Sequence, residues 1–168
     1  MMTYAEYVDS GECVVSRRRQ GKLVAVLGTC VGLAVRDREA QVGGILHLLL
    51  PEPTGAQQPW EPEKYASTGV PVFLNMLKEH GAEPSRMEAC MAGGALVGPL
   101  SEMDLAMDIG GRTTEIAERA LREAGVRIVE SETGGYFTCN LVLDLSNLEM
   151  AIEPPLRSPE GTEGDGEA

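Results

Sequence analysis

Two short apolar runs separated by a polar segment constrain this chain more than any other feature of its sequence. The runs are Val31 to Val35 and Ile45 to Leu50, and the polar residues Arg36 to Gln41 lie between them. β-Branched residues and leucines fill the runs and glycines bound them, so the pattern predicts strand, turn, strand. A β-hairpin is the simplest fold for such a segment.

The register of this hairpin decides which side chains face each other. With residues 37 to 40 as the turn, Arg36 pairs with Gln41, and the same register places Cys30 opposite His47. Directly opposed residues of an antiparallel pair share one face, with Cβ atoms roughly 4.5 to 5.5 Å apart. The predicted register therefore brings a thiol within hydrogen-bonding reach of an imidazole.

A cysteine beside a histidine suits nucleophilic catalysis. A thiol with a pKa of about 8.5 is only slightly ionised at neutral pH, and a neighbouring imidazole raises the thiolate fraction. Two alternatives stay open. Free cysteine is among the most buried residue types, so the pair is also compatible with an ordinary core. A bulge at Gly43-Gly44 would turn His47 to the other face of the sheet.

Several short motifs occur in a fixed order around this hairpin and downstream of it. They are Leu27-Gly28-Thr29-Cys30-Val31, Asp37, Val42-Gly43-Gly44, His47, Leu50-Pro51, Lys64-Tyr65-Ala66-Ser67-Thr68, Pro71, Gly93-Gly94-Ala95, Ile109-Gly110, Arg112 and Gly134-Gly135. In order and spacing they resemble the CheD family, the chemoreceptor glutamine deamidases of bacterial and archaeal chemotaxis. The resemblance covers roughly residues 5 to 152.

The resemblance implies an α+β fold, with a layered, β-sandwich-like core of antiparallel and mixed strands and with helices outside. It also implies that Cys30 is the catalytic nucleophile and His47 the catalytic histidine. The implied activity is deamidation of glutamines on methyl-accepting chemotaxis receptors through a thioester. An alternative is a weakly active or inactive CheD-like adaptor that binds chemoreceptors or a CheC-type phosphatase. A general cysteine hydrolase for small amides or esters is a third hypothesis.

The chain departs from the family pattern at three positions. The family threonine six residues before the cysteine is Val24 here, and its parity with Cys30 predicts a side chain on the Cys30 face. The family arginine after the second glycine pair is Cys139, and the asparagine after Arg112 is Thr113. Without a hydroxyl at residue 24, a backbone carbonyl or a water must orient the imidazole.

Composition excludes several classes of function. The formal net charge of −12 argues against nucleic-acid binding, which needs clustered Lys and Arg. No apolar run approaches the roughly 18 residues of a membrane-spanning helix. The four cysteines, Cys13, Cys30, Cys90 and Cys139, lack the spacing of a zinc site or of a disulfide framework. We therefore expect a cytoplasmic protein that needs no metal or cofactor and does not insert into a membrane.

One domain is expected over residues 1–156, followed by a disordered acidic tail over 157–168. Apolar periodicity predicts helices at Tyr65 to His80, capped by Ser67 or Thr68, and at Glu115 to Ala124, capped by Thr113 or Thr114. Further strands are predicted at 12–16, 87–96, 126–130, 136–145 and 149–153, with 126–130 and 136–145 forming a second hairpin. In the proline-rich loop at 51–62, Trp60 is a candidate contact for substrate or partner, or simply packs on the surface.

Overall fold

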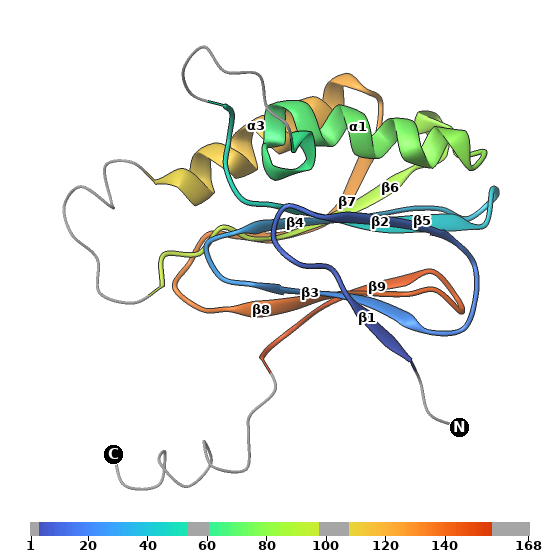
Figure 1. Ribbon diagram of the computed structural model, residues 1–168, viewed down its shortest axis with the longest axis horizontal. Coiled ribbons are helices and arrows are strands. Elements are labelled where there is room, and N and C mark those ends of the chain that lie inside the picture. The colour runs from blue at the N-terminus through green and yellow to red at the C-terminus, as the bar shows by residue number, and fades with distance from the viewer. Residues whose placement is uncertain (1–3, 54–60, 98–107, 156–168) are drawn as a thin grey trace, which may run out of the picture.

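The computed structural model of the chain describes residues 4–53, 61–97 and 108–155. Within these ranges the protein has three layers: a pair of helices, a five-stranded sheet and a four-stranded sheet (Figure 1). The helices are α1 (Ala66–Glu79) and α3 (Ile109–Glu123). The strands are β1 (Ala5–Tyr7), β2 (Cys13–Arg17), β3 (Lys22–Leu27), β4 (Val31–Asp37), β5 (Val42–Leu48), β6 (Glu88–Gly93), β7 (Arg127–Thr133), β8 (Cys139–Asp144) and β9 (Glu149–Glu153). The predicted layered α+β class is confirmed.

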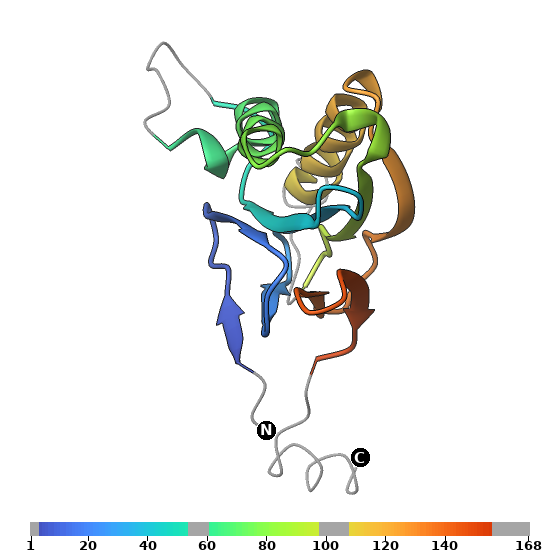
Figure 2. The same ribbon diagram turned by 90° about the vertical axis from the view of Figure 1, so that its right-hand side faces the viewer.

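The two sheets contain both parallel and antiparallel pairs. The five-stranded sheet has the order β2-β5-β4-β6-β7, and the four-stranded sheet has the order β1-β3-β8-β9. The pairs β1–β3 and β6–β7 are parallel, and the other pairs are antiparallel. The two helices cover one face of the five-stranded sheet and the four-stranded sheet covers the other, as the two views together show (Figures 1 and 2).

Strands β4 and β5 are buried on both faces because they lie at the middle of these layers. On the helix side, Val31, Leu33 and Val35 of β4 belong to one apolar cluster with Phe73 of α1. On the other side, alternate residues belong to a second cluster between the two sheets, to which both sheets contribute. Its buried members are Val8, Leu23, Ala25, Leu27, Ala34, Ile45, Cys90, Ala92, Leu141, Leu143, Leu145 and Leu148. Burial on both faces explains why β4 and β5 have near-continuous apolar sequences.

Helix α1 confirms the predicted apolar face, but its predicted cap is wrong. Val70, Phe73, Leu74 and Leu77 are buried against the sheet. The N-cap is Tyr65, whose side chain makes no capping hydrogen bond. The hydroxyl of Thr68, an expected cap, instead donates to the carbonyl of Pro62 at 2.7 Å. The preceding 3₁₀ turn therefore takes the hydroxyl that would otherwise cap the helix.

Helix α3 begins at Ile109, earlier than the predicted start at Glu115. Its N-cap is Asp108, whose carboxylate accepts from the N–H of Gly111 at 3.1 Å. The two predicted caps lie inside the helix, where the hydroxyl of Thr113 donates to the carbonyl of Ile109 at 2.7 Å. Such a bond to the preceding turn satisfies a hydroxyl within a helix, so the threonines did not mark its start.

The predicted hairpin between residues 126–130 and 136–145 is wrong. Both segments form strands, but β7 pairs with β6 in the five-stranded sheet and β8 pairs with β3 and β9 in the other. Between them, Gly134 and Gly135 have positive φ angles of 81° and 74°. Glycine adopts this conformation readily, so the chain can turn sharply here and pass from one sheet to the other.

The other predicted strands are confirmed, because β2, β6 and β9 overlap residues 12–16, 87–96 and 149–153. Strand β9 lies at the edge of its sheet. Trp60 and the tail at 157–168 lie outside the described residues. Among the helices that the structure describes, none is long and apolar enough to cross a membrane.

Candidate active site

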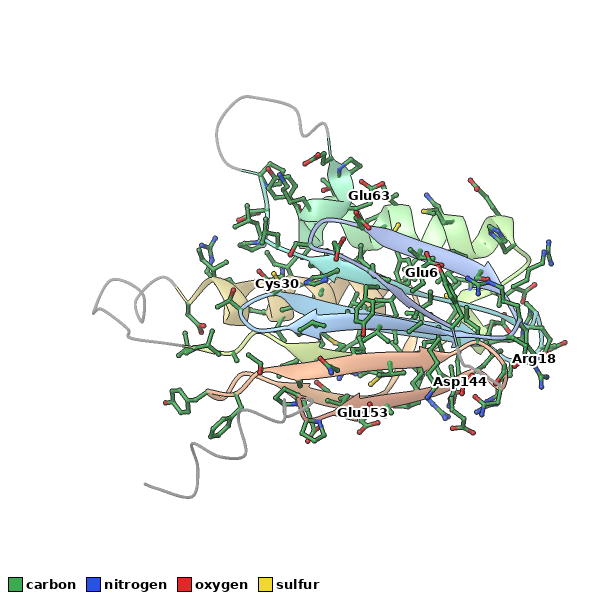
Figure 3. The ribbon with its side chains drawn as sticks, turned by 60° about the horizontal axis from the view of Figure 1, so that its bottom comes forward. Glu6, Arg18, Cys30, Glu63, Asp144 and Glu153 are labelled. Atoms are coloured by element: carbon green, nitrogen blue, oxygen red, sulfur yellow. The ribbon has the colours of Figure 1, made fainter. Side chains whose placement is uncertain are left out.

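Cys30 lies in a bend between β3, which ends at Leu27, and β4, which begins at Val31. This bend is at the end of the molecule opposite Arg18 and Asp144 (Figure 3). The side chain of Cys30 is half-buried and packs against the apolar cluster between the two sheets.

Two glycines at the end of β6 fix the backbone of Cys30. The N–H of Gly94 donates to the carbonyl of Cys30 at 2.8 Å. Gly93 has a φ of +95°, and a Cβ at this position would overlap the same carbonyl oxygen. The Gly-Gly pair therefore lets one backbone approach the other closely.

His47 lies in β5 and is buried, with a relative exposure of 4%. It alternates with Leu46 and Leu48, which face the helices, and it shares the face of Ile45, which belongs to the cluster between the sheets. Its side chain therefore points to the side of the five-stranded sheet on which Cys30 packs. The edge of β5 near His47 is closed by the N-terminal segment: Gly11 donates to the carbonyl of His47 at 2.8 Å.

The predicted pairing of Cys30 with His47 is wrong by two residues. His47 lies opposite Gly32, and the pairing of β4 with β5 runs without a bulge. A shift of two residues keeps the same face of each strand, whereas a shift of one would have reversed it. Cys30 thus precedes the residue opposite His47 by two positions instead of facing it.

The turn chemistry of Asp37 explains this shift. Asp37 pairs with Val42, so the turn comprises residues 38–41 instead of 37–40. The buried carboxylate of Asp37 accepts from the N–H groups of Glu39 at 3.0 Å and Ala40 at 3.1 Å. An aspartate that bonds the backbone two residues on initiates a turn, and here it does so from the last position of β4.

The imidazole of His47 is oriented by the main chain. Its Nδ1 lies 2.7 Å from the carbonyl oxygen of Val8. A carbonyl only accepts, so Nδ1 carries the hydrogen and Nε2 of the neutral ring has a free lone pair. Nε2 is buried and has no hydrogen-bond partner among the described residues. Buried polar atoms are nearly always paired, so this nitrogen needs an explanation, and a catalytic role is one.

The expected hydrogen bond between His47 and Cys30 is not formed, and the Sγ of Cys30 contacts Ser10. The Oγ of Ser10 lies 3.7 Å from Sγ, and either atom can be the donor. Sequence reasoning missed both Ser10 and the carbonyl of Val8. A backbone carbonyl has no signature in the sequence, and an exposed serine in a loop has none either.

The other three cysteines are poorly suited to act as nucleophiles. Burial, with a smaller influence of Glu63, raises the pKa of the Cys13 thiol to about 11. Burial, with the neighbouring charges of Glu130 and Glu132, raises the pKa of Cys90 to about 12. Burial also raises the pKa of Cys139. Because the thiolate is the reactive form, all three are held in the unreactive state at neutral pH.

His80 is the second histidine of the chain. It follows the last residue of α1, and its Nδ1 lies 2.8 Å from the carbonyl of Met76 in the preceding turn. This bond satisfies a carbonyl at the helix end, where a histidine also complements the helix dipole. His80 is therefore a structural partner of α1.

Val24 does not face the site, contrary to the prediction from its parity with Cys30. Its neighbours Leu23 and Ala25 belong to the cluster between the sheets, so Val24 lies on the outer face of β3, where it pairs with Val142. The bend at residues 28–30 interrupts the strand, so the parity rule does not carry across it.

The other two departures from the family pattern are Thr113 and Cys139. Thr113 is buried and internally bonded within α3, and Arg112 pairs with Glu52 at 3.5 Å on the surface. Cys139 lines an open cavity of about 370 Å³ together with Gly93. The connection from β7 to β8 contributes most of the remaining wall, including the exposed side chains of Tyr136 and Phe137. The cavity therefore adjoins the glycines that hold Cys30.

Comparison with known proteins identifies the family. The family model described as CheD chemotactic sensory transduction matches residues 49–154. The chain is 33% identical over 126 residues to the probable chemoreceptor glutamine deamidase CheD of Desulforamulus reducens, covering 75% of this chain and 76% of that protein. The chain belongs to the CheD family. The probable chemoreceptor glutamine deamidase CheD of Symbiobacterium thermophilum is 38% identical over 140 residues, with 82% of this chain and 85% of that protein covered.

A solved structure of Bacillus licheniformis hypothetical protein YfiH has a TM-score of 0.46 to this fold and 18% sequence identity. It covers 71% of this chain and 49% of that protein. The stretch matched by the CheD family model begins after His47. The assignment of Cys30 and His47 therefore depends on their geometry and on the motifs around them.

Proposed function

We propose that this CheD-family protein is a protein-glutamine deamidase that acts on chemoreceptors through Cys30 and His47. The relatives named above carry the description of probable chemoreceptor glutamine deamidase. The observation that carries the proposal is the buried Nε2 of His47, which has a free lone pair and no partner among the described residues. Such a nitrogen suits a general base, and a thiol on the same side of the sheet suits a nucleophile.

The proposed reaction has two stages. The Sγ of Cys30 attacks the carbon of a glutamine side-chain amide while its proton passes to Nε2 of His47. The tetrahedral intermediate collapses, and ammonia leaves with that proton, which gives a thioester on Cys30. Water then attacks the thioester, with His47 taking a proton from the water and returning it to sulfur. The products are glutamate on the receptor and the free thiol.

The first stage requires the thiol hydrogen of Cys30 to point to Nε2 of His47. Catalytic hydrogen bonds are often long or unformed without substrate, so we expect this contact to form when the receptor binds. The carbonyl of Val8 meanwhile holds the imidazole in the tautomer that the reaction needs. A main-chain group thus performs the orienting role that the family pattern assigns to a threonine.

The negative oxygen of the tetrahedral intermediate needs a hydrogen-bond donor. The main-chain N–H of Cys30 is the nearest candidate in sequence, and no described residue accepts from it. One such donor is typically worth a factor of about 10² to 10³ in rate. We place this activity in the cytoplasm, because a thiol nucleophile needs a reducing compartment.

Mass spectrometry of a candidate chemoreceptor tests the proposal. Incubation with the wild-type protein should add about 1 Da at specific glutamines, because an amide nitrogen is replaced by oxygen. Cys30→Ser should leave the receptor unchanged while keeping its fold. Failure of the wild type to deamidate any chemoreceptor would contradict the proposal. Binding to a receptor or to a CheC-type phosphatase without deamidation would instead identify an adaptor.

A further inference from the structure

We propose that Ser10 is a further catalytic residue, whose hydroxyl holds the Cys30 thiol in the resting site and donates a hydrogen bond to the thiolate during the reaction. This inference rests on the proposed role of Cys30 as a nucleophile. It assigns to the N-terminal loop a task that the sequence motifs around Cys30 and His47 do not indicate.

The contact of Ser10 with sulfur is the first observation. Its Oγ lies 3.7 Å from the Sγ of Cys30, within the range of hydrogen bonds that involve sulfur. Ser10 is exposed, and Cys30 is half-buried. The hydroxyl therefore approaches the sulfur from the solvent side, whereas the apolar cluster between the sheets contacts it from inside.

The anchoring of the Ser10 loop is the second observation. Before Ser10, the N–H of Val8 donates to the carbonyl of Val24 at 2.8 Å, and the Val8 carbonyl meets Nδ1 of His47 at 2.7 Å. After Ser10, Gly11 donates to the carbonyl of His47 at 2.8 Å. Bonds on both sides thus fix the loop against β3 and against His47. The single loop between β1 and β2 thus contacts both proposed catalytic side chains.

The two contacts of this loop have different tasks. The Val8 carbonyl already takes the hydrogen of the imidazole, so Ser10 is not needed to orient His47. Its hydroxyl lies at the sulfur, and it is both a donor and an acceptor. It can accept the thiol hydrogen in the resting state and reverse its role when that hydrogen leaves.

The proton balance of this step is complete within the site. The thiol proton moves to Nε2 of His47, and the sulfur becomes an anion that can only accept hydrogen bonds. The Ser10 hydroxyl then donates to this anion and keeps its own proton. A hydrogen bond to a charged group is stronger than one to a neutral group, so the contact favours the thiolate over the thiol.

Alkylation of Cys30 in the full-length protein tests this role. Rates with iodoacetamide should be measured by peptide mass spectrometry from pH 6 to about 10, a range that spans an ordinary thiol pKa. At pH 7, Ser10→Ala should be alkylated about tenfold more slowly than the wild type, and its rate profile should shift to higher pH. Ser10→Thr keeps the hydroxyl and should retain the wild-type profile.

Ser131→Ala is the matched control, because it removes an exposed serine hydroxyl from β7 and should change nothing. The circular dichroism spectra of all variants should coincide, since Ser10 is exposed. An unchanged alkylation profile in Ser10→Ala would overturn the proposal. Equal loss in Ser10→Ala and Ser10→Thr would also overturn it, by assigning the effect to loop packing.

This assay needs no receptor, so its outcome is separate from that of the deamidation test. If Ser10→Ala slows the alkylation of Cys30 but the wild type deamidates no receptor, the deamidase proposal is refuted and the role of Ser10 at the thiol stands. Deamidation by the wild type with no effect of Ser10→Ala on either rate would refute Ser10 alone.

Discussion

Gly93→Ala should damage the site without touching either proposed catalytic side chain. Residue 93 has a φ of +95°, and an added Cβ would overlap the carbonyl oxygen of Cys30 and lie 3.2 Å from the Cβ of Leu27. The carbonyl is part of the main chain, so it cannot rotate away as the end of a flexible side chain could. We expect the backbone of Cys30 to move and its bond from the N–H of Gly94 to weaken.

A matched glycine separates the cost of the steric overlap from the cost of the positive φ angle. Gly134 has a φ of +81°, and nothing lies within 4 Å of a Cβ built on it. Gly134→Ala should therefore show only the cost of a left-handed alanine, about 1 to 2 kcal/mol. Gly93→Ala adds the overlap and a weakened hydrogen bond, so its free energy of unfolding should fall by about 3 kcal/mol or more. For a domain of this size that corresponds to a melting temperature lower by about 6 to 12 °C.

Urea unfolding and the alkylation rate of Cys30 should be measured for both variants. Gly93→Ala should lose stability and change the reactivity of Cys30, whereas Gly134→Ala should lose less stability and keep the wild-type reactivity. Equal stabilities of the two variants, with Cys30 reactivity unchanged in both, would refute the view that close backbone packing at Gly93 positions the nucleophile.

Three further variants test the fold and the orientation of the site. Asp37→Ala should lower the free energy of unfolding by about 1 to 3 kcal/mol, because it leaves the N–H groups of Glu39, Ala40 and Glu83 without their carboxylate acceptor. Burial opposes ionisation of Asp37, but bonds from Arg86 and from main-chain N–H groups hold its pKa below the ordinary value. The wild type should therefore lose stability as the pH falls below about 4 toward this lowered pKa. The urea midpoint of Asp37→Ala should fall less over the same pH range. Val24→Thr should leave the deamidation rate unchanged, since residue 24 faces away from Cys30; a large gain in turnover would contradict this orientation. Phe73→Ala should cost about 3 to 5 kcal/mol in urea unfolding, because Phe73 is fully buried between α1 and the sheet; a cost below 1 kcal/mol would contradict that packing.

The sequence predicted most of the elements because their apolar periodicity survives in the fold. The β4–β5 hairpin and the buried face of α1 follow directly from the spacing of apolar residues. Errors occurred where a single polar group decides the geometry. The Asp37 carboxylate moved the turn by one residue, and the Asp108 carboxylate started α3 before the threonines that were expected to cap it.

Long-range pairing was harder to predict than local structure. The strands β7 and β8 follow each other in sequence but belong to different sheets, which no local pattern indicates. The site shows the same limit. The motifs indicated Cys30 and His47, whereas Val8 and Ser10 act through a carbonyl and a loop hydroxyl whose positions depend on the packing of the N-terminal segment.

Selective modification of thiols tests most directly the claim that Cys30 and His47 form one reactive site. With limiting iodoacetamide at neutral pH, Cys30 should be modified ahead of the other three cysteines, whose thiols are held protonated by burial. His47→Ala should slow the modification of Cys30 itself, because the thiol then has no base to take its proton. Equal labelling of all four cysteines in the wild type, or a rate of Cys30 modification that His47→Ala leaves unchanged, would contradict the claim.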